Sequence, residues 1–213
     1  MCELIEPEAL EPIVKNNSGI IVDVCDYSRY AKAHIPSALH LQPQETFGPY
    51  PHKIGDLPNL NRIKEIIIKL GIINHKPVYI YYDIGGVLAS RLIWLLDCVG
   101  YHNWILINGG LISWLKEGRA YKSTSSIDKT QEKKEIELKL KSLAHEYNFT
   151  KNQIISTLHS NDIIFWDSRS KGEFTGETKK AARAGHIPGS IHLDYRDLLN
   201  PNEYLAKAYS IDS

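Results

Sequence analysis

Two stretches of this 213-residue chain resemble each other, and this internal repeat limits the possible folds more than any other feature. The first covers residues 22–41 and the second covers residues 166–193. Each contains, in order, an apolar run that reaches Asp, a polar segment, an aromatic residue, His-Ile-Pro with two small residues, and an apolar-His-Leu ending. The second stretch has a longer insert before its first histidine. A repeat of this size predicts duplicated modules, because a solenoid needs three or more short units.

The sequence around the first stretch predicts strands and helices in alternation. Short apolar or β-branched runs predict buried strands, at residues 19–24, 77–82 and 104–107. Helical spacing of apolar residues predicts helices, at residues 60–70, 87–98 and 111–116. Alternation of this kind is typical of a parallel sheet with right-handed crossovers. We therefore predict an α/β fold with a central parallel sheet flanked by helices.

The second half of the chain has a sparser pattern. Residues 119–131 are polar and resemble a linker, and residues 135–141 alternate apolar and charged side chains, which predicts a half-exposed edge strand. A helix is expected at 150–160 and a buried strand at 162–166. These patterns predict three parts: a complete first module at 1–120, a linker with an edge strand at 121–149, and a partial second module at 150–213.

Charge and composition exclude several classes of protein. Lys plus Arg and Asp plus Glu both number 25, so the chain has no overall positive charge for nucleic acid binding. No apolar run approaches the ~20 residues that span a bilayer, and the N-terminus has no basic and apolar signal-peptide pattern. Three widely spaced cysteines do not suggest a disulfide framework. We expect a soluble cytoplasmic protein without a membrane or nucleic acid partner.

Several motifs resemble the signatures of the rhodanese family. In the first module they are Asp23, Tyr30, residues 34–38 and residues 108–114; in the second they are residues 167–169, Glu173-Phe174 and residues 185–190. The resemblance is to tandem-domain thiosulfate and 3-mercaptopyruvate sulfurtransferases. It implies a rhodanese-like α/β fold, a small anionic sulfur donor and no cofactor. It also implies a loop cysteine that carries sulfur as a persulfide, normally in the second domain.

Asp83 stands where that catalytic cysteine would lie in the first module. The matching loop is 83–89, between the strand at 77–82 and the helix at 87–98. A carboxylate does not carry sulfur, and its negative charge opposes an incoming thiosulfate. We expect Asp83 to cap the helix or brace the loop, with a switch or a partner contact as the alternative.

None of the three cysteines is expected to replace the missing thiol. Cys25 follows the first predicted strand, where the family pattern commonly has Arg, and is expected to be small and partly buried. Cys98 lies in an apolar helix and is expected in the core, whereas Cys2 lies at the N-terminus. None has the helix N-terminus or neighbouring base that activates a thiol. We therefore expect no catalytic residue in this chain.

The second module contains two candidate substrate-binding residues, Arg169 and Arg183. Arg169 matches the Arg of the family's Asp-x-Arg motif, which the resemblance places toward the substrate anion. A guanidinium suits two-point binding of a carboxylate or sulfonate. The alternative is that Arg169 pairs with an acidic neighbour such as Glu173. The family's next strand, cysteine loop and helix do not follow before residue 213, so we expect these arginines to be vestigial.

Four histidines allow a metal-binding alternative, at positions 34, 40, 186 and 192. A zinc site needs three or four converging ligands, and no Cys or acidic cluster supplies the others. We therefore expect no metal, and expect the histidines before Ile-Pro to brace their turns by hydrogen bonds. Four tryptophans occupy apolar positions and are expected in the core, at positions 94, 104, 114 and 166.

Two functions follow from these observations. The first is membership of the sulfurtransferase family, with this chain inactive alone for lack of the loop cysteine. The second is a non-catalytic rhodanese-like binding or regulatory module whose protein partner is unknown. A weaker third reading, a relative of dual-specificity phosphatases, also needs a loop cysteine and fails at the same residue, Asp83.

Overall fold

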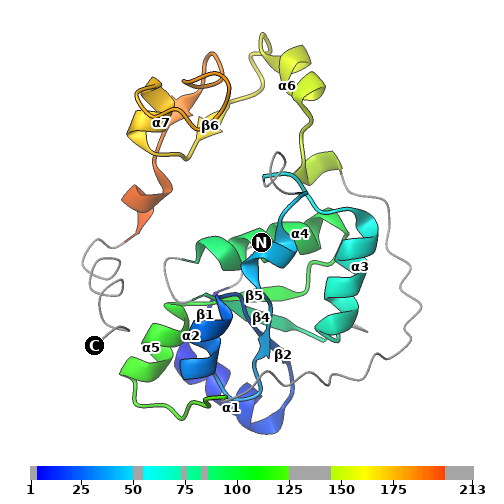
Figure 1. Ribbon diagram of the computed structural model, residues 1–213, viewed down its shortest axis with the longest axis vertical. Helices are drawn as coiled ribbons and strands as arrows, with labels where there is room; N and C mark the ends of the chain where they lie inside the picture. Colours follow the sequence, from blue (N-terminus) through cyan, green and yellow to red (C-terminus); the bar gives the residue numbers. More distant parts are fainter. Residues whose placement is uncertain (1–3, 50–54, 73–75, 83–85, 125–144, 200–213) are drawn as a thin grey trace. The chain divides into compact units, whose positions relative to one another are not determined.

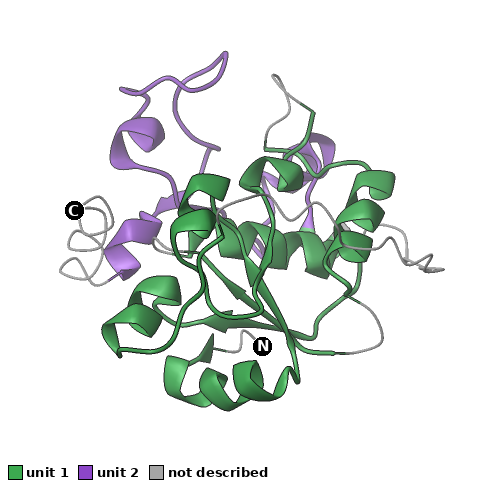
Figure 2. Cartoon of the chain, turned by 60° about the horizontal axis from the view of Figure 1, so that its bottom comes forward, with its two compact units in different colours: residues 1–147 green, residues 148–213 purple. Residues whose placement is uncertain are grey.

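The computed structural model describes residues 4–49, 55–72, 76–82, 86–124 and 145–199 (Figure 1). The chain divides into two compact units, residues 1–147 and residues 148–213 (Figure 2). Each unit is described by itself below. No described helix is long and apolar enough to cross a membrane.

Unit 1 contains a five-stranded sheet in which every pair of neighbours is parallel. Its strands are β1 (Leu4–Ile5), β2 (Ile20–Asp23), β3 (Leu39–His40), β4 (Val78–Tyr81) and β5 (Trp104–Ile107). Their spatial order is β1-β5-β4-β2-β3, so β2 and β4 lie inside the sheet. The predicted parallel α/β fold is confirmed.

Five helices flank this sheet: α1 (Pro7–Asn16), α2 (Tyr27–Lys32), α3 (Leu60–Lys69), α4 (Val87–Cys98) and α5 (Gly110–Lys116). Two 3₁₀ turns, η1 (Pro43–Thr46) and η2 (His145–Tyr147), complete the unit. In α3, Ile63, Ile66 and Ile67 recur at helical spacing and are buried. The Asn59 side chain caps this helix by accepting a hydrogen bond from the Arg62 amide at 2.9 Å.

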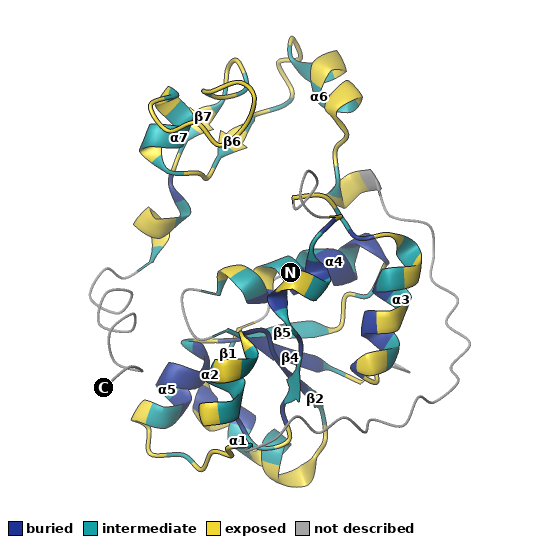
Figure 3. Cartoon of the chain, in the orientation of Figure 1, coloured by how far each residue is buried: buried dark blue, intermediate teal, exposed yellow. Residues whose placement is uncertain are grey.

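Each face of the sheet has its own core. Val22 and Ile80 point to one face, where they pack with the apolar sides of α3 and α4. Ile21 and Tyr81 point to the other face, toward α1 and α5, where Trp114 is also buried. Burial on both faces explains why β4 and the first three residues of β2 are uninterrupted by charged side chains instead of alternating (Figure 3).

The first strand and first helix, β1 and α1, were not expected from the sequence. The prolines of this segment indicate a break, yet both fit a helix. Pro7 is the first helical residue, where no amide donor is needed, and Pro12 lies farther inside. Leu10 is fully buried, so packing on the sheet stabilises a helix that local propensity disfavours.

Unit 2 contains less regular structure. Its elements are α6 (Lys151–Thr157), β6 (Trp166–Asp167), α7 (Lys171–Thr175), β7 (Ile191–His192) and the 3₁₀ turn η3 (Tyr195–Leu198). The strands β6 and β7 form a parallel pair. The predicted buried strand at 162–166 is wrong, because Ile164 is 77% exposed and Trp166 is 54% exposed. Among the described residues β6 pairs only with β7, so one face of the pair remains open.

The region expected to form a linker is partly attached to unit 1. Lys122 and His34 exchange two backbone hydrogen bonds of 2.9 Å in an antiparallel bridge. Farther along, the indole of Trp94 in α4 donates a hydrogen bond to the Tyr147 carbonyl in η2 at 2.5 Å. The expected edge strand at 135–141 lies outside the described residues.

Candidate functional site

In unit 1, three aromatic rings from the first similar stretch pack together beside the carboxyl ends of β2 and β3. The Tyr30 ring stacks on His34 with centroids 3.9 Å apart and lies 4.8 Å from His40. His34 Nδ1 is 2.8 Å from the Tyr30 carbonyl oxygen, and His40 Nε2 is 2.7 Å from the carbonyl oxygen of Cys25. The rings therefore connect α2 to the turn and strand that follow it.

The second stretch forms the same cluster in unit 2. The Phe174 ring stacks on His186 at 3.8 Å and lies 4.7 Å from His192. His186 Nδ1 is 2.7 Å from the Phe174 carbonyl oxygen, and His192 Nε2 is 2.9 Å from the carbonyl oxygen of Arg169. Both histidines before Ile-Pro thus brace their turns, as expected from the sequence. Each of the four histidines already faces a backbone carbonyl.

The two clusters differ at the residue whose carbonyl the last histidine contacts. In unit 2 this residue is Arg169, and its guanidinium forms a two-point pair with Asp167, with Nε and Nη2 2.9 and 2.5 Å from the two carboxylate oxygens. Nη2 also donates to the Gly185 carbonyl at 2.9 Å. The pair with Arg169 lowers the pKa of Asp167. The acidic partner of Arg169 is thus Asp167 and not Glu173, whose carboxylate accepts a hydrogen bond from Ser170.

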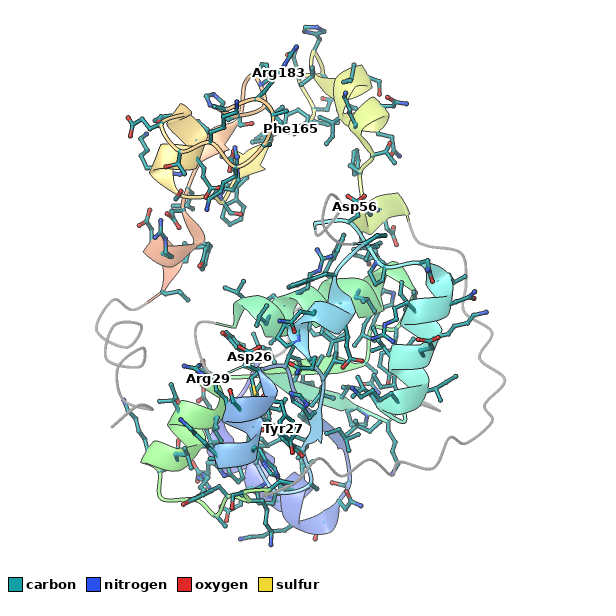
Figure 4. The ribbon with its side chains drawn as sticks, in the orientation of Figure 1. Asp26, Tyr27, Arg29, Asp56, Phe165 and Arg183 are labelled. Atoms are coloured by element: carbon teal, nitrogen blue, oxygen red, sulfur yellow. The ribbon has the colours of Figure 1, made fainter. Side chains whose placement is uncertain are left out.

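In unit 1 the corresponding residue is Cys25, and the corresponding carboxylate, Asp23, is buried. No described group donates a hydrogen bond of normal geometry to either Asp23 oxygen. Burial raises the pKa of Asp23 to about 6, and the nearby Cys25 thiol and Tyr81 hydroxyl oppose this shift only in part. Within the described residues Asp23 therefore has no guanidinium partner of the kind that Arg169 provides for Asp167. The position of this end of β2 can be followed in Figure 4 from the labelled residues Asp26 and Tyr27, at the start of α2.

The two cysteines in the described part of the chain are free and buried. Cys25 is more deeply buried than expected, with 2% of its surface exposed. Burial and then the nearby Asp23 raise the pKa of its thiol far above the ordinary value. Cys98 lies in the core, as expected, and burial raises its pKa to about 11. Neither thiol is a ready source of thiolate at neutral pH. Cys2 lies outside the described residues.

The loop that would carry the family cysteine follows β4. Residues 83–85, including Asp83, lie outside the described part. The N-cap residue of α4 is Gly86, with a φ of 72°, and the expected role of Asp83 lies outside the described residues. On the other side of this loop, Gly110 approaches so closely that a β-carbon there would lie 2.2 Å from the Tyr82 carbonyl oxygen. The turn before α5 therefore packs directly on the backbone at the start of the loop.

Arg183, the second candidate binding residue, is exposed on the segment between α7 and His186. No hydrogen bond or ion pair within the described residues joins it to Arg169. The described part of the chain also contains no group of three or more His, Cys, Asp and Glu side chains arranged to hold a metal ion. The Arg169 side chain, paired with Asp167, remains 43% exposed.

Comparison with known proteins gives consistent matches. Residues 6–117 match the model of the rhodanese-like domain family. The thiosulfate sulfurtransferase of Pseudomonas aeruginosa is 33% identical over 201 residues, which cover 93% of this chain and 71% of that protein. The thiosulfate sulfurtransferase of Azotobacter vinelandii is also 33% identical, over 95% of this chain and 72% of that protein.

Solved structures share the fold. The crystal structure of SseA from Escherichia coli, described as a 3-mercaptopyruvate sulfotransferase with the rhodanese fold, aligns with a TM-score of 0.77 and 18% identity. The alignment covers 100% of this chain and 86% of that one. The Tum1 protein of Saccharomyces cerevisiae aligns with a TM-score of 0.75 and 19% identity, covering 95% of this chain and 73% of that one. At these identities the structures establish the fold alone.

Proposed function

Since this chain belongs to the rhodanese-like domain family, we propose that it is a thiosulfate or 3-mercaptopyruvate sulfurtransferase relative that binds the sulfur donor but holds no sulfur-carrying thiol in residues 1–213. The observation that carries the proposal is the contrast between the two Asp motifs. Asp167 orients an exposed Arg169, whereas Asp23 is followed by the buried Cys25. One unit thus offers a cation to an anionic donor, and the other does not.

The proposed modular arrangement is a tandem pair, with a first rhodanese-like module at 1–120, a linker at 121–149 and part of a second module at 150–213. The matching ring clusters of Tyr30 and Phe174 support this duplication. In this arrangement Asp83 takes the place of the first module's catalytic cysteine. We also propose a reducing, cytoplasmic setting, supported by the free thiols of Cys25 and Cys98.

In the reaction of intact family members, a thiolate attacks the outer sulfur of thiosulfate. A persulfide forms and sulfite leaves; cyanide then takes the outer sulfur as thiocyanate and regenerates the thiolate. Arg169 would hold the anionic end of the donor during the first step. Arg183 would add positive charge nearby. No residue of the described part supplies the attacking thiolate, because both described thiols are buried with raised pKa values.

The direct test measures thiocyanate production from thiosulfate and cyanide by the purified chain. We expect no turnover above that of the Cys2→Ser/Cys25→Ser/Cys98→Ser variant, and no thiosulfate-dependent gain of one sulfur atom in the mass spectrum. Thiosulfate binding, measured by calorimetry, should be lost in Arg169→Gln and partly kept in Arg169→Lys. Robust turnover in the triple cysteine variant, or a persulfide on Cys25, would contradict the proposal.

The second candidate is a non-catalytic binding or regulatory module. The carboxylate Asp83 at the family's cysteine position favours it, because no thiolate can form there. The two candidates separate in the calorimetric experiment. A donor-binding relative binds thiosulfate through Arg169, whereas a purely protein-binding module shows no thiosulfate binding in either the wild-type chain or Arg169→Gln.

A further inference from the structure

Residues 177–184 have no counterpart in the first similar stretch. In unit 1, Tyr30 and His34 lie close together in the sequence, and their rings stack with centroids 3.9 Å apart. In unit 2, the equivalent rings of Phe174 and His186 stack at 3.8 Å although a longer segment joins them. The extra residues therefore form a loop between Phe174 and His186 that leaves the stacking of these two rings unchanged.

The base of this segment is fixed at both ends. Where α7 ends, the amides of Gly176 and Thr178 both donate to the Gly172 carbonyl, at 3.1 and 2.9 Å. The segment returns at Gly185, and a β-carbon on Gly176 would lie 3.2 Å from the Gly185 amide nitrogen. The two glycines thus form a narrow neck. A loop closed at its neck is held in place better than a free tail, so its outer residues are presented at a defined position.

The outer part of the loop is basic. It carries three cations, Lys179, Lys180 and Arg183, and one acid, Glu177, and all residues from 177 to 184 are exposed. Within the described residues none of the three cations forms an ion pair with an acid. Figure 4 labels Arg183 on this loop. The local excess of positive charge contrasts with a chain in which Lys plus Arg and Asp plus Glu both number 25.

The neck of the loop adjoins the candidate donor site. Gly185, at the neck, accepts a hydrogen bond from Arg169 Nη2 at 2.9 Å. The neck of the loop therefore contacts the guanidinium that we assign to donor binding. The contact between Gly185 and Arg169 thus joins residues 177–184 to the residue of unit 2 for which we propose donor binding.

We propose that residues 177–184 form a docking loop for an acidic patch on another protein, which the loop places beside Arg169. A small anion is a poor match for Lys179 and Lys180, because both side chains are exposed and offer no buried site that could remove water from it. A nucleic acid is also a poor match, since Lys plus Arg and Asp plus Glu both number 25 and the chain has no overall positive charge to meet a row of phosphates. An acidic protein surface supplies opposite charge, and it can also displace water from around the loop when it binds.

The docking proposal depends on the proposed function only for the role of Arg169. It is tested with a fluorescein-labelled octaglutamate peptide as the acidic probe, followed by fluorescence anisotropy. We expect Lys179→Ala/Lys180→Ala to weaken binding about five- to tenfold, and the matched Lys→Glu pair to abolish it. The Lys179→Arg/Lys180→Arg variant should bind as the wild type does, and affinity should fall as salt increases.

The matched control is Lys116→Ala/Lys151→Ala, which removes the same charge from exposed positions outside the loop. Equal loss in both double variants would overturn the proposal, as would unchanged binding in Lys179→Ala/Lys180→Ala. Tighter binding of an oligonucleotide with the same number of charges would also overturn it. Thiosulfate binding, measured in parallel, should be unchanged in Lys179→Ala/Lys180→Ala and lost in Arg169→Gln, so failure of the docking proposal and failure of the donor-site proposal give different results.

Discussion

Asp23 lies at the carboxyl end of β2 beside Cys25, and its buried carboxyl group receives no hydrogen bond of normal geometry from the described residues. In the second unit the same two positions hold Asp167 and Arg169, which form a two-point ion pair. The two carboxyl groups therefore differ both in burial and in the presence of a guanidinium partner. Burial raises the pKa of one Asp, and the guanidinium lowers the pKa of the other.

Replacing the buried acid, in Asp23→Asn, should make the folded protein more stable at neutral pH. The pKa of Asp23 is about 6 in the folded protein and 3.8 without burial, so the folded state holds the proton more tightly. The free energy of unfolding consequently falls as pH rises between about 4 and 6, by about 3 kcal/mol in total. Urea denaturation across this range should show a smaller slope in the variant.

The matched control for that experiment is Asp26→Asn, which removes an exposed carboxylate three residues away. It relieves no burial of a carboxylate, so it should not raise the free energy of unfolding at neutral pH as Asp23→Asn does. If Asp23→Asn instead lowered the free energy of unfolding at neutral pH, the carboxylate would have to be stabilised in the folded state, and the assigned direction of its pKa shift would be wrong.

Loss of the guanidinium in Arg169→Gln should raise the pKa of Asp167 toward its ordinary value. The side-chain hydrogen bonds from Arg169 are the main cause of the lowered pKa, so the pKa of Asp167 should rise when they are removed. Carboxyl carbon chemical shifts followed through an acid titration measure this. Arg196→Gln, which breaks the similar pair with Asp194, is the control and should move only the Asp194 titration. An unmoved Asp167 titration in Arg169→Gln would contradict the pairing.

Much of the first unit could be predicted from local sequence pattern. The helix at 87–98 and the strand at 104–107 were predicted with the bounds that the structure has, because their apolar runs are bordered by glycine or polar residues. The helix α1 was missed because two prolines outweighed the apolar spacing around Leu10. Its stability comes from burial against the sheet, a tertiary effect that local propensity does not contain.

The candidate site was predictable in its residues but not in its contacts. The Asp-x-Arg motif identified Arg169, and a pair with an acidic neighbour such as Glu173 was the alternative to substrate binding. The chosen partner, Asp167, lies two residues earlier, and its carboxylate also accepts a hydrogen bond from the Arg169 amide at 3.1 Å. In the sequence, the docking loop at residues 177–184 can be recognised only as a longer insert in the second similar stretch. Its neck and the contact of Gly185 with Arg169 depend on backbone positions far apart in sequence.

A side chain at Gly110 should destabilise unit 1 strongly. Gly110→Ala places a β-carbon 2.2 Å from the Tyr82 carbonyl oxygen, and the φ of +54° is itself unfavourable for Ala. We expect a loss of roughly 2 kcal/mol or more in the free energy of unfolding, measured by urea denaturation. Gly118→Ala is the control, because Gly118 has a φ of +69° and open space around it. It should lose only about 1 kcal/mol. Equal losses would mean that the Tyr82 contact has no effect.

The open face of β6 and β7 differs from its equivalent in unit 1. Trp166 and Ile191 are register partners, and both are more than half exposed; Ile164 and Leu193 extend the same apolar face. Val22 and Leu41, which correspond to Trp166 and Leu193, are fully buried in the core that α3 and α4 cover, and Leu39, the counterpart of Ile191, packs partly buried against it. Among the described residues no helix covers the unit 2 face in this way.

Replacing Trp166 with Thr should therefore reduce binding of a hydrophobic dye and self-association without unfolding unit 1. The indole contributes the largest apolar surface of this face, and exposed apolar patches favour both processes. Dye fluorescence and analytical ultracentrifugation measure the change. Tyr121→Thr, at an exposed aromatic residue of unit 1, is the control and should leave both signals close to those of the wild type. If the two variants behaved alike, the apolar surface responsible for association would have to lie elsewhere than on β6 and β7.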